Sequence, residues 1–89
     1  MNPTQLTVVL EGVDVRDSSQ EELASEIFKK ELSKKDYMPT DNFVSLRDKK
    51  MSNIRAKRIS TQEDVEIYAY TTVKEEDGKI KTIVSMKIV

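Results

Sequence analysis

The sequence predicts an α+β fold, a mostly antiparallel β-sheet with one amphipathic helix packed on one face, in the order β-α-β-β-β-β. The prediction rests on a β-hairpin in residues 65–89, an amphipathic helix in residues 18–35 and a strand in residues 6–15. The chain has 89 residues, which is enough for one hydrophobic core. We therefore expect one small domain that spans residues 1–89.

In the first strand, alternate positions are apolar and share one face: Leu6, Val8 and Leu10. Val9 interrupts the polar side of this strand, which indicates a strand that is apolar on both faces and lies inside the sheet. After Gly12 the alternation shifts by one residue and continues with Val13 and Val15. Either a one-residue bulge at Glu11 and Gly12 returns these valines to the face of Leu10, or the strand ends at Gly12.

The helix is expected over residues 18–35, where either Ser18 or Ser19 can cap it, because each is followed three residues later by a glutamate. The apolar residues fall on one stripe at helical spacing: Leu23, Ala24, Ile27, Phe28 and Leu32. Residues 37–42 are expected to be a connection, in which Pro39 prevents the helix from continuing. We expect the apolar stripe to cover the inner face of the sheet.

Residues 43–60 allow two interpretations. The first is a short strand over 43–47, a charged turn at 48–50 and a second strand that runs from about residue 53 to residue 60. The second is another helix, capped by Asp41, with these residues facing inward: Phe43, Val44, Met51 and Ile54. We favour the strands, because the helix would contain a full turn without any apolar residue.

The C-terminal hairpin has Asp77 and Gly78 between two alternating runs, a strong signal for a tight turn. A two-residue turn pairs Glu76 with Lys79, whereas a four-residue loop pairs Lys74 with Lys79. Both registers place the same residues on one shared face: Val65, Ile67, Ala69, Thr71, Val73, Ile80, Thr82, Val84, Met86 and Ile88. This largely apolar face must be covered by the rest of the chain.

The composition argues against several classes of function. The chain has no histidine, no cysteine and two glycines, so it lacks the usual general base, the thiolate ligands of zinc and a glycine-rich phosphate loop. Acidic residues gather near the predicted start of the helix, but their spacing matches no calcium loop: Glu11, Asp14, Asp17 and Glu21. We expect no enzyme activity, no catalytic residue, no cofactor and no metal site. We also expect a cytoplasmic protein without a membrane span, because no long apolar run is present.

The net charge of −1 conceals a basic segment in the middle of the chain. Its cations are Arg47, Lys49, Lys50, Arg55, Lys57 and Arg58. On the second face of the hairpin, Tyr68 and Tyr70 are expected to lie together, with Lys87 near Tyr68. Tyrosines beside cations on an open sheet face can stack on nucleobases, although dedicated nucleic-acid modules are usually basic overall.

These features predict a small non-enzymatic module that binds an unidentified protein partner or has a regulatory role. The expected contact residues are Tyr68, Tyr70 and Lys87 on the exposed sheet face, or the C-terminal strand if it forms an edge of the sheet. The alternatives are a nucleic-acid-binding module that uses the basic segment Arg47–Arg58 and a structural subunit of an assembly. The sequence leaves the oligomeric state and the identity of the partner open.

Overall fold

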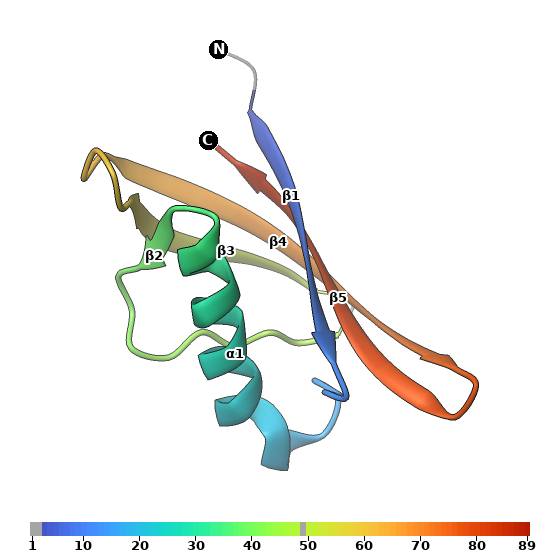
Figure 1. The fold of residues 1–89 in the computed structure, drawn as a ribbon. Helices are drawn as coiled ribbons and strands as arrows, with labels where there is room; N and C mark the ends of the chain where they lie inside the picture. Colours follow the sequence, from blue (N-terminus) through green and yellow to red (C-terminus); the bar gives the residue numbers. More distant parts are fainter. Residues whose placement is uncertain (1–2, 49) are drawn as a thin grey trace.

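The computed structural model describes residues 3–48 and 50–89, and it shows one α-helix packed against a curled, five-stranded antiparallel sheet (Figure 1). The elements are β1 (Thr4–Glu11), a 3-10 turn (Ser18–Gln20), α1 (Glu21–Lys34), β2 (Tyr37–Pro39), β3 (Met51–Arg58), β4 (Asp64–Glu76) and β5 (Lys79–Ile88). The order of strands across the sheet is β1-β5-β4-β3-β2. The α+β class and the predicted order of elements along the chain are confirmed.

The β4–β5 hairpin has the two-residue turn, because Glu76 pairs with Lys79, so the four-residue alternative is wrong. Asp77 and Gly78 both have positive φ angles, 52° and 73°, as a type I′ turn requires. The shared face is buried at most of its predicted positions, including Ile67 and Val84, which are both 0% exposed. Local turn chemistry therefore sets the register of the two longest strands.

Helix α1 lies across the inner face of the sheet and supplies Ala24, Phe28 and Leu32 to the core. Leu23, which the apolar stripe placed inward, is 50% exposed. Neither Ser18 nor Ser19 caps the helix: the N-cap of α1 is Gln20, which makes no side-chain cap bond, and Asp17 caps the 3-10 turn that precedes the helix. The Asp17 carboxylate accepts a hydrogen bond from the backbone N–H of Ser19 at 3.0 Å, a bond typical of a cap. No helix within the described residues is long and apolar enough to cross a membrane.

Strand β1 ends at Glu11, so the alternative in which the strand stops near Gly12 is correct. Gly12 adopts a φ of 73°, a conformation that glycine tolerates best, and its N–H donates to the Ile80 carbonyl at 2.8 Å. Val13 and Val15 still return to the core, where they are 2% and 5% exposed. The connection after β1 therefore contributes to the hydrophobic core, although it is not part of the strand.

Neither interpretation of residues 43–60 is fully correct. Strand β3 confirms the second predicted strand, but residues 43–47 form no strand, and the predicted connection over residues 37–42 contains β2. Val44 and Leu46 do alternate into the core, at 4% exposed each. Their segment is held by side-chain hydroxyl groups rather than by a neighbouring strand, which the sequence pattern alone does not distinguish.

The C-terminal strand β5 is not an edge, which corrects the expectation that its backbone is open to a partner. It lies between β4 and β1, and β1 pairs with it from Thr4 opposite Ile88 to Glu11 opposite Lys81. Strand β1 itself is an edge of the sheet, so the prediction that it lies inside is also wrong. Pairing between the two ends of the chain decides both outcomes, and such pairing leaves no local signal in the sequence.

Candidate functional site

The side chains that point away from α1 form a surface that no other described residue covers. They are the odd-numbered residues of β1, β3 and β5 and the even-numbered residues of β4, because side chains alternate between the two faces of a strand. We refer to this surface as the open face. The opposite, inner face is the one that packs against α1 and is largely buried.

The centre of the open face is apolar and aromatic. Tyr70 stands opposite Met51 of β3 on one side and opposite Ser85 of β5 on the other. In the next row, Val9 of β1 stands opposite the half-buried Ile83 of β5. Met51 is 63% exposed, and Tyr70 and Val9 are both 42% exposed. Four strands therefore contribute to one exposed apolar surface, which is a common feature of binding sites.

Tyr68 and Lys87 lie directly opposite each other on β4 and β5, as the hairpin pattern predicts. Together with Met51 and Val89 they line a shallow depression in the open face. The Tyr68 hydroxyl donates a hydrogen bond of 2.7 Å to the Glu66 carboxylate. This bond and the negative charge of Glu66 raise the pKa of the Tyr68 hydroxyl above its ordinary value, so the phenol stays protonated and its ring orientation is defined.

The basic segment does not form one continuous positive surface. Arg55 and Lys57 are on the open face, but each faces an acidic residue: Arg55 is opposite Glu66, and Lys57 is opposite Asp64. The Lys57 ammonium lies 3.2 Å from the Asp64 carboxylate. The positive charge of this part of β3 is therefore balanced by β4.

The other cations of the segment lie elsewhere. Arg58 points to the inner face, where its guanidinium stacks over the Tyr37 ring at 5.0 Å from the centroid. Arg47 and Lys50 precede β3, at the opposite end of a strand that is about 24 Å long at 3.4 Å per residue. Lys49 is outside the described residues. The structure thus separates cations that are close together in the sequence.

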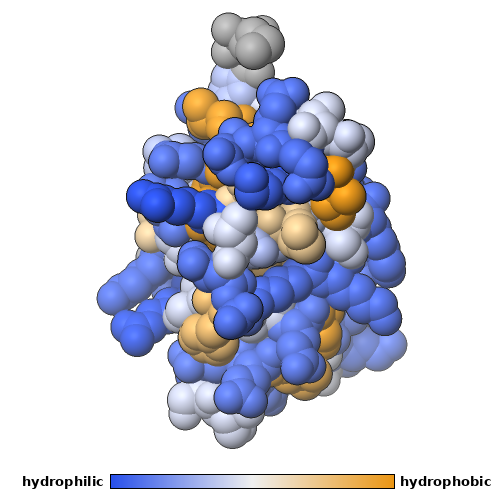
Figure 2. All heavy atoms as spheres, turned by 90° about the vertical axis from the view of Figure 1, so that its left-hand side faces the viewer, coloured by the Kyte–Doolittle hydropathy of each residue, from blue (hydrophilic) through white to orange (hydrophobic). Residues whose placement is uncertain are grey.

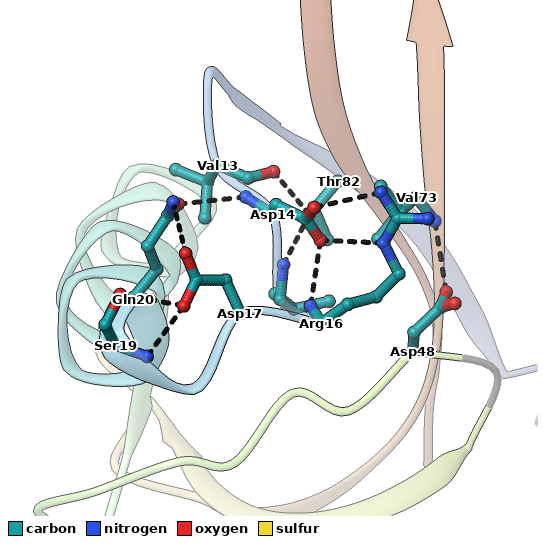
Figure 3. Close-up of polar contacts among 10 residues, drawn as sticks. Val13, Asp14, Arg16, Asp17, Ser19, Gln20, Asp48, Val73 and Thr82 are labelled. Atoms are coloured by element: carbon teal, nitrogen blue, oxygen red, sulfur yellow. Dashed lines mark hydrogen bonds and ion pairs between the residues drawn. The ribbon is translucent and has the colours of Figure 1, made fainter.

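Two of the four acidic residues near the start of the helix, Asp14 and Asp17, take part in local contacts (Figure 3). The Asp14 carboxylate accepts two hydrogen bonds of 2.9 Å from the Arg16 guanidinium, and these bonds hold the pKa of Asp14 below its ordinary value. The Asp17 carboxylate accepts from the hydroxyl and the backbone N–H of Ser19, which lowers the pKa of Asp17. Within residues 3–48 and 50–89, no three acidic residues are grouped closely enough to hold a metal ion.

The side of the molecule that is on the left in Figure 1 differs from the open face. Its surface is mostly hydrophilic, and the hydrophobic residues coloured there form separate spots (Figure 2). This side includes β2 and the turn between β3 and β4. The open face is therefore the stronger candidate for a binding surface.

Sequence reasoning found Tyr68, Tyr70 and Lys87 but missed two members of the same surface, Val9 and Met51. The sequence pattern predicts Val9 inside the sheet, and it offers Met51 only as an inward residue of a second helix. The missing information is the order of the strands, since β3 and β1 bring these side chains next to the hairpin. The one available signal is Val9, an apolar residue on the otherwise polar side of β1. Such a residue fits an exposed position as well as a buried one.

A scan against protein-family models, a search of curated proteins and a search of solved structures each returned no match for this chain.

Proposed function

We propose that this chain is a non-enzymatic, cytoplasmic interaction module that binds a partner protein through the open face of its sheet. The observation that supports this proposal best is the exposed apolar centre of that face, formed by Met51, Tyr70 and Val9 from three strands. Exposed apolar side chains that adjoin one another on a protein surface often mark an interaction site. Tyrosine and methionine are also enriched in protein interfaces.

The polar surroundings of this centre indicate what the partner surface offers. Lys87 and Arg55 lie toward one end of the open face, and Glu11, Lys81 and Lys74 lie toward the other. A partner with an apolar centre and a mixed polar rim fits this arrangement, because the core of a typical interface is apolar and its rim is hydrated. The Tyr68 ring, oriented by Glu66, provides a rigid contact area close to the apolar centre.

Site-specific photo-crosslinking tests the proposal. A benzoylphenylalanine is placed at Tyr70, and a matched control carries it at Lys30, an exposed residue of α1. After irradiation in extract of the source cell, we expect discrete cross-linked protein products from position 70 that are absent from position 30. Met51→Ser in the first protein should weaken these products, because it removes an exposed apolar neighbour of Tyr70. Equal products from both positions, or none from position 70, would contradict the proposal.

Nucleic-acid binding is the second candidate, favoured by the two tyrosines beside Lys87 on an open sheet face. The pairing of Arg55 and Lys57 with acidic residues weakens it, because those cations are already balanced. Fluorescence anisotropy with labelled single-stranded oligonucleotides at low salt separates the two functions. Binding that weakens steeply with added salt would support the second candidate, and nuclease treatment of the extract would then remove the cross-linked products.

A further inference from the structure

The sheet has free backbone groups along β2, along the far half of β4 and along β1. Strand β2 has three residues, and Pro39 lacks an N–H, so this edge offers little to a partner strand. Beyond Tyr70, where β3 begins, the described residues give β4 only an isolated bridge on that side, between Thr71 and Asp48. There the Asp48 carboxylate accepts the N–H of Val73 at 3.1 Å, and the strand continues with charged residues. Both edges are thus blocked by features that commonly prevent strand pairing.

Strand β1 lacks such protection. Its eight residues, Thr4–Glu11, include no lysine, no proline and no glycine, and the single charge is at Glu11. The Gly12 N–H donates to the carbonyl of Ile80, the residue directly across from it. This bond shows which residues of β1 bond to β5 and which point away from it, because the two kinds alternate along an antiparallel strand. Even-numbered residues of β1 bond to β5, and the outward N–H and C=O groups belong to the odd-numbered residues: Gln5, Thr7, Val9 and Glu11.

Helix α1 adds an apolar flank beside this edge. One side of α1 faces the connection after β2, because the Ser25 hydroxyl accepts the Val44 N–H and the Lys29 ammonium donates to the Asn42 carbonyl. At 100° per residue, Ile27 and Leu23 lie on the other side of the helix. Figure 1 shows α1 between β2 and β1, so that other side is the one toward β1. Leu23 is 50% exposed, and Ile27 is partly exposed.

We propose that β1 pairs antiparallel with β1 of a second copy of this chain, which joins the two sheets into one. The two-fold axis passes beside Val8 of each copy. In this register Thr7 pairs with Val9 of the second copy, and Gln5 pairs with Glu11 of the second copy. All four outward residues of each strand are then hydrogen-bonded, and each Glu11 faces an amide rather than another carboxylate. An axis at Thr7 would place Glu11 opposite Pro3, beyond the end of the ladder. A register shifted by one residue would place the outward N–H and C=O groups of one copy opposite residues whose groups already bond to β5.

The same axis brings the apolar flanks together. Antiparallel pairing of identical edges keeps α1 of both copies on the same side of the joined sheet. The Leu23 and Ile27 flanks then face each other, and a second copy covers the part of the helical stripe that one copy leaves exposed. On the opposite side, Val9 of one copy is beside Thr7 of the other, so the two open faces become continuous. The pairing does not depend on the proposed function of those faces.

Sedimentation equilibrium over a concentration series tests the pairing. We expect the wild-type mass to approach twice that of one chain. Thr7→Pro should reduce the association at least tenfold, because it removes an outward N–H without removing a bond to β5. Glu75→Pro is the matched control: it removes an outward N–H from the free part of β4, and the mass should stay doubled. A wild type that is monomeric at every concentration overturns the proposal. The β1 edge would then be available to a strand of another protein. Equal effects of the two prolines overturn it as well.

Cysteine crosslinking tests the register independently of any effect of proline on folding. The chain has no cysteine, so the variants Thr7→Cys and Val9→Cys each carry a single thiol. When the two variants are mixed and oxidised, we expect a disulfide-linked pair, because directly opposed residues have Cα atoms about 5.5 Å apart. Each variant alone should crosslink several-fold less, since like positions are diagonal neighbours about 7–8 Å apart. Equal crosslinking of Thr7→Cys alone overturns the axis at Val8, and no crosslinking in the mixture overturns the pairing.

Discussion

Buried hydroxyl groups hold the irregular segments of this chain in place. The buried polar side chains among the described residues are Ser25, Thr71 and Thr82. Thr82 bonds the connection after β1, Ser25 accepts the N–H of Val44, and Thr71 donates to the carbonyl of Arg47. Each hydroxyl satisfies a backbone group that no strand or helix satisfies, so the core includes segments without regular structure.

Thr82→Val tests this role at the site with two bonds. The substitution keeps the shape of the side chain but leaves the Val13 carbonyl and the Val15 N–H without their partner. We expect the free energy of unfolding to fall by about 1–3 kcal/mol, measured by urea denaturation. Thr72→Val, on the open face, is the control and should change stability by less than about 0.5 kcal/mol. Equal losses in both variants would show that the buried hydrogen bonds of Thr82 add nothing to the free energy of unfolding beyond what an exposed threonine contributes.

The contact between Asp14 and Arg16 predicts a pH dependence. Because the hydrogen bonds from Arg16 lower the pKa of Asp14 from 3.8, the folded state is favoured above that value. This contribution is lost as the pH falls through the lower, folded-state pKa. Arg16→Gln should raise the pKa of Asp14 toward its ordinary value, as followed by NMR titration of the carboxyl carbon. Lys34→Gln breaks the ion pair with Glu31 instead and should leave Asp14 unchanged.

At the scale of the element, local signals predicted the helix and the hairpin, and non-local pairing decided what the sequence did not reveal. The Asp77-Gly78 turn fixed which residues face inward, and with them the position of Tyr68 opposite Lys87. The alternation in β5 did not decide whether this strand forms an edge, because the same alternation is compatible with a strand between two neighbours. Non-local pairing also explains why Val9 and Met51 belong to the candidate site, because only the strand order makes them neighbours of the hairpin.

Gly78→Ala tests the turn on which that register depends. Alanine must adopt the φ of 73°, which costs about 1–2 kcal/mol for a residue with a β-carbon. We expect a loss of that order in the free energy of unfolding, measured by thermal and urea denaturation. Asp77→Asn should be close to neutral, because Asn-Gly suits the same turn. If the alanine variant were as stable as the wild type, the turn would not determine the register.

At the scale of the whole molecule, the single helix covers the inner side of a curled sheet and leaves two surfaces available, the open face and the β1 edge. Both include β1, since its odd-numbered residues provide outward backbone groups as well as open-face side chains. A second copy at the edge would therefore enlarge the open face rather than block it. A partner that contacts both copies would bind more tightly than one that contacts a single copy.

Pairing through β1 would make the stability of the folded protein depend on the protein concentration. If the folded state is a pair and the unfolded state is single chains, each tenfold rise in protein concentration adds about 1.4 kcal/mol to the apparent stability of the pair. We expect the thermal midpoint of the wild type to rise with concentration and that of Thr7→Pro to stay constant, as measured by calorimetry. Glu75→Pro should keep the slope of the wild type, because the edge of β4 takes no part in the pairing. A wild-type midpoint that is the same at every concentration would place all of the stability within one chain, and the unprotected edge of β1 would then need a different explanation.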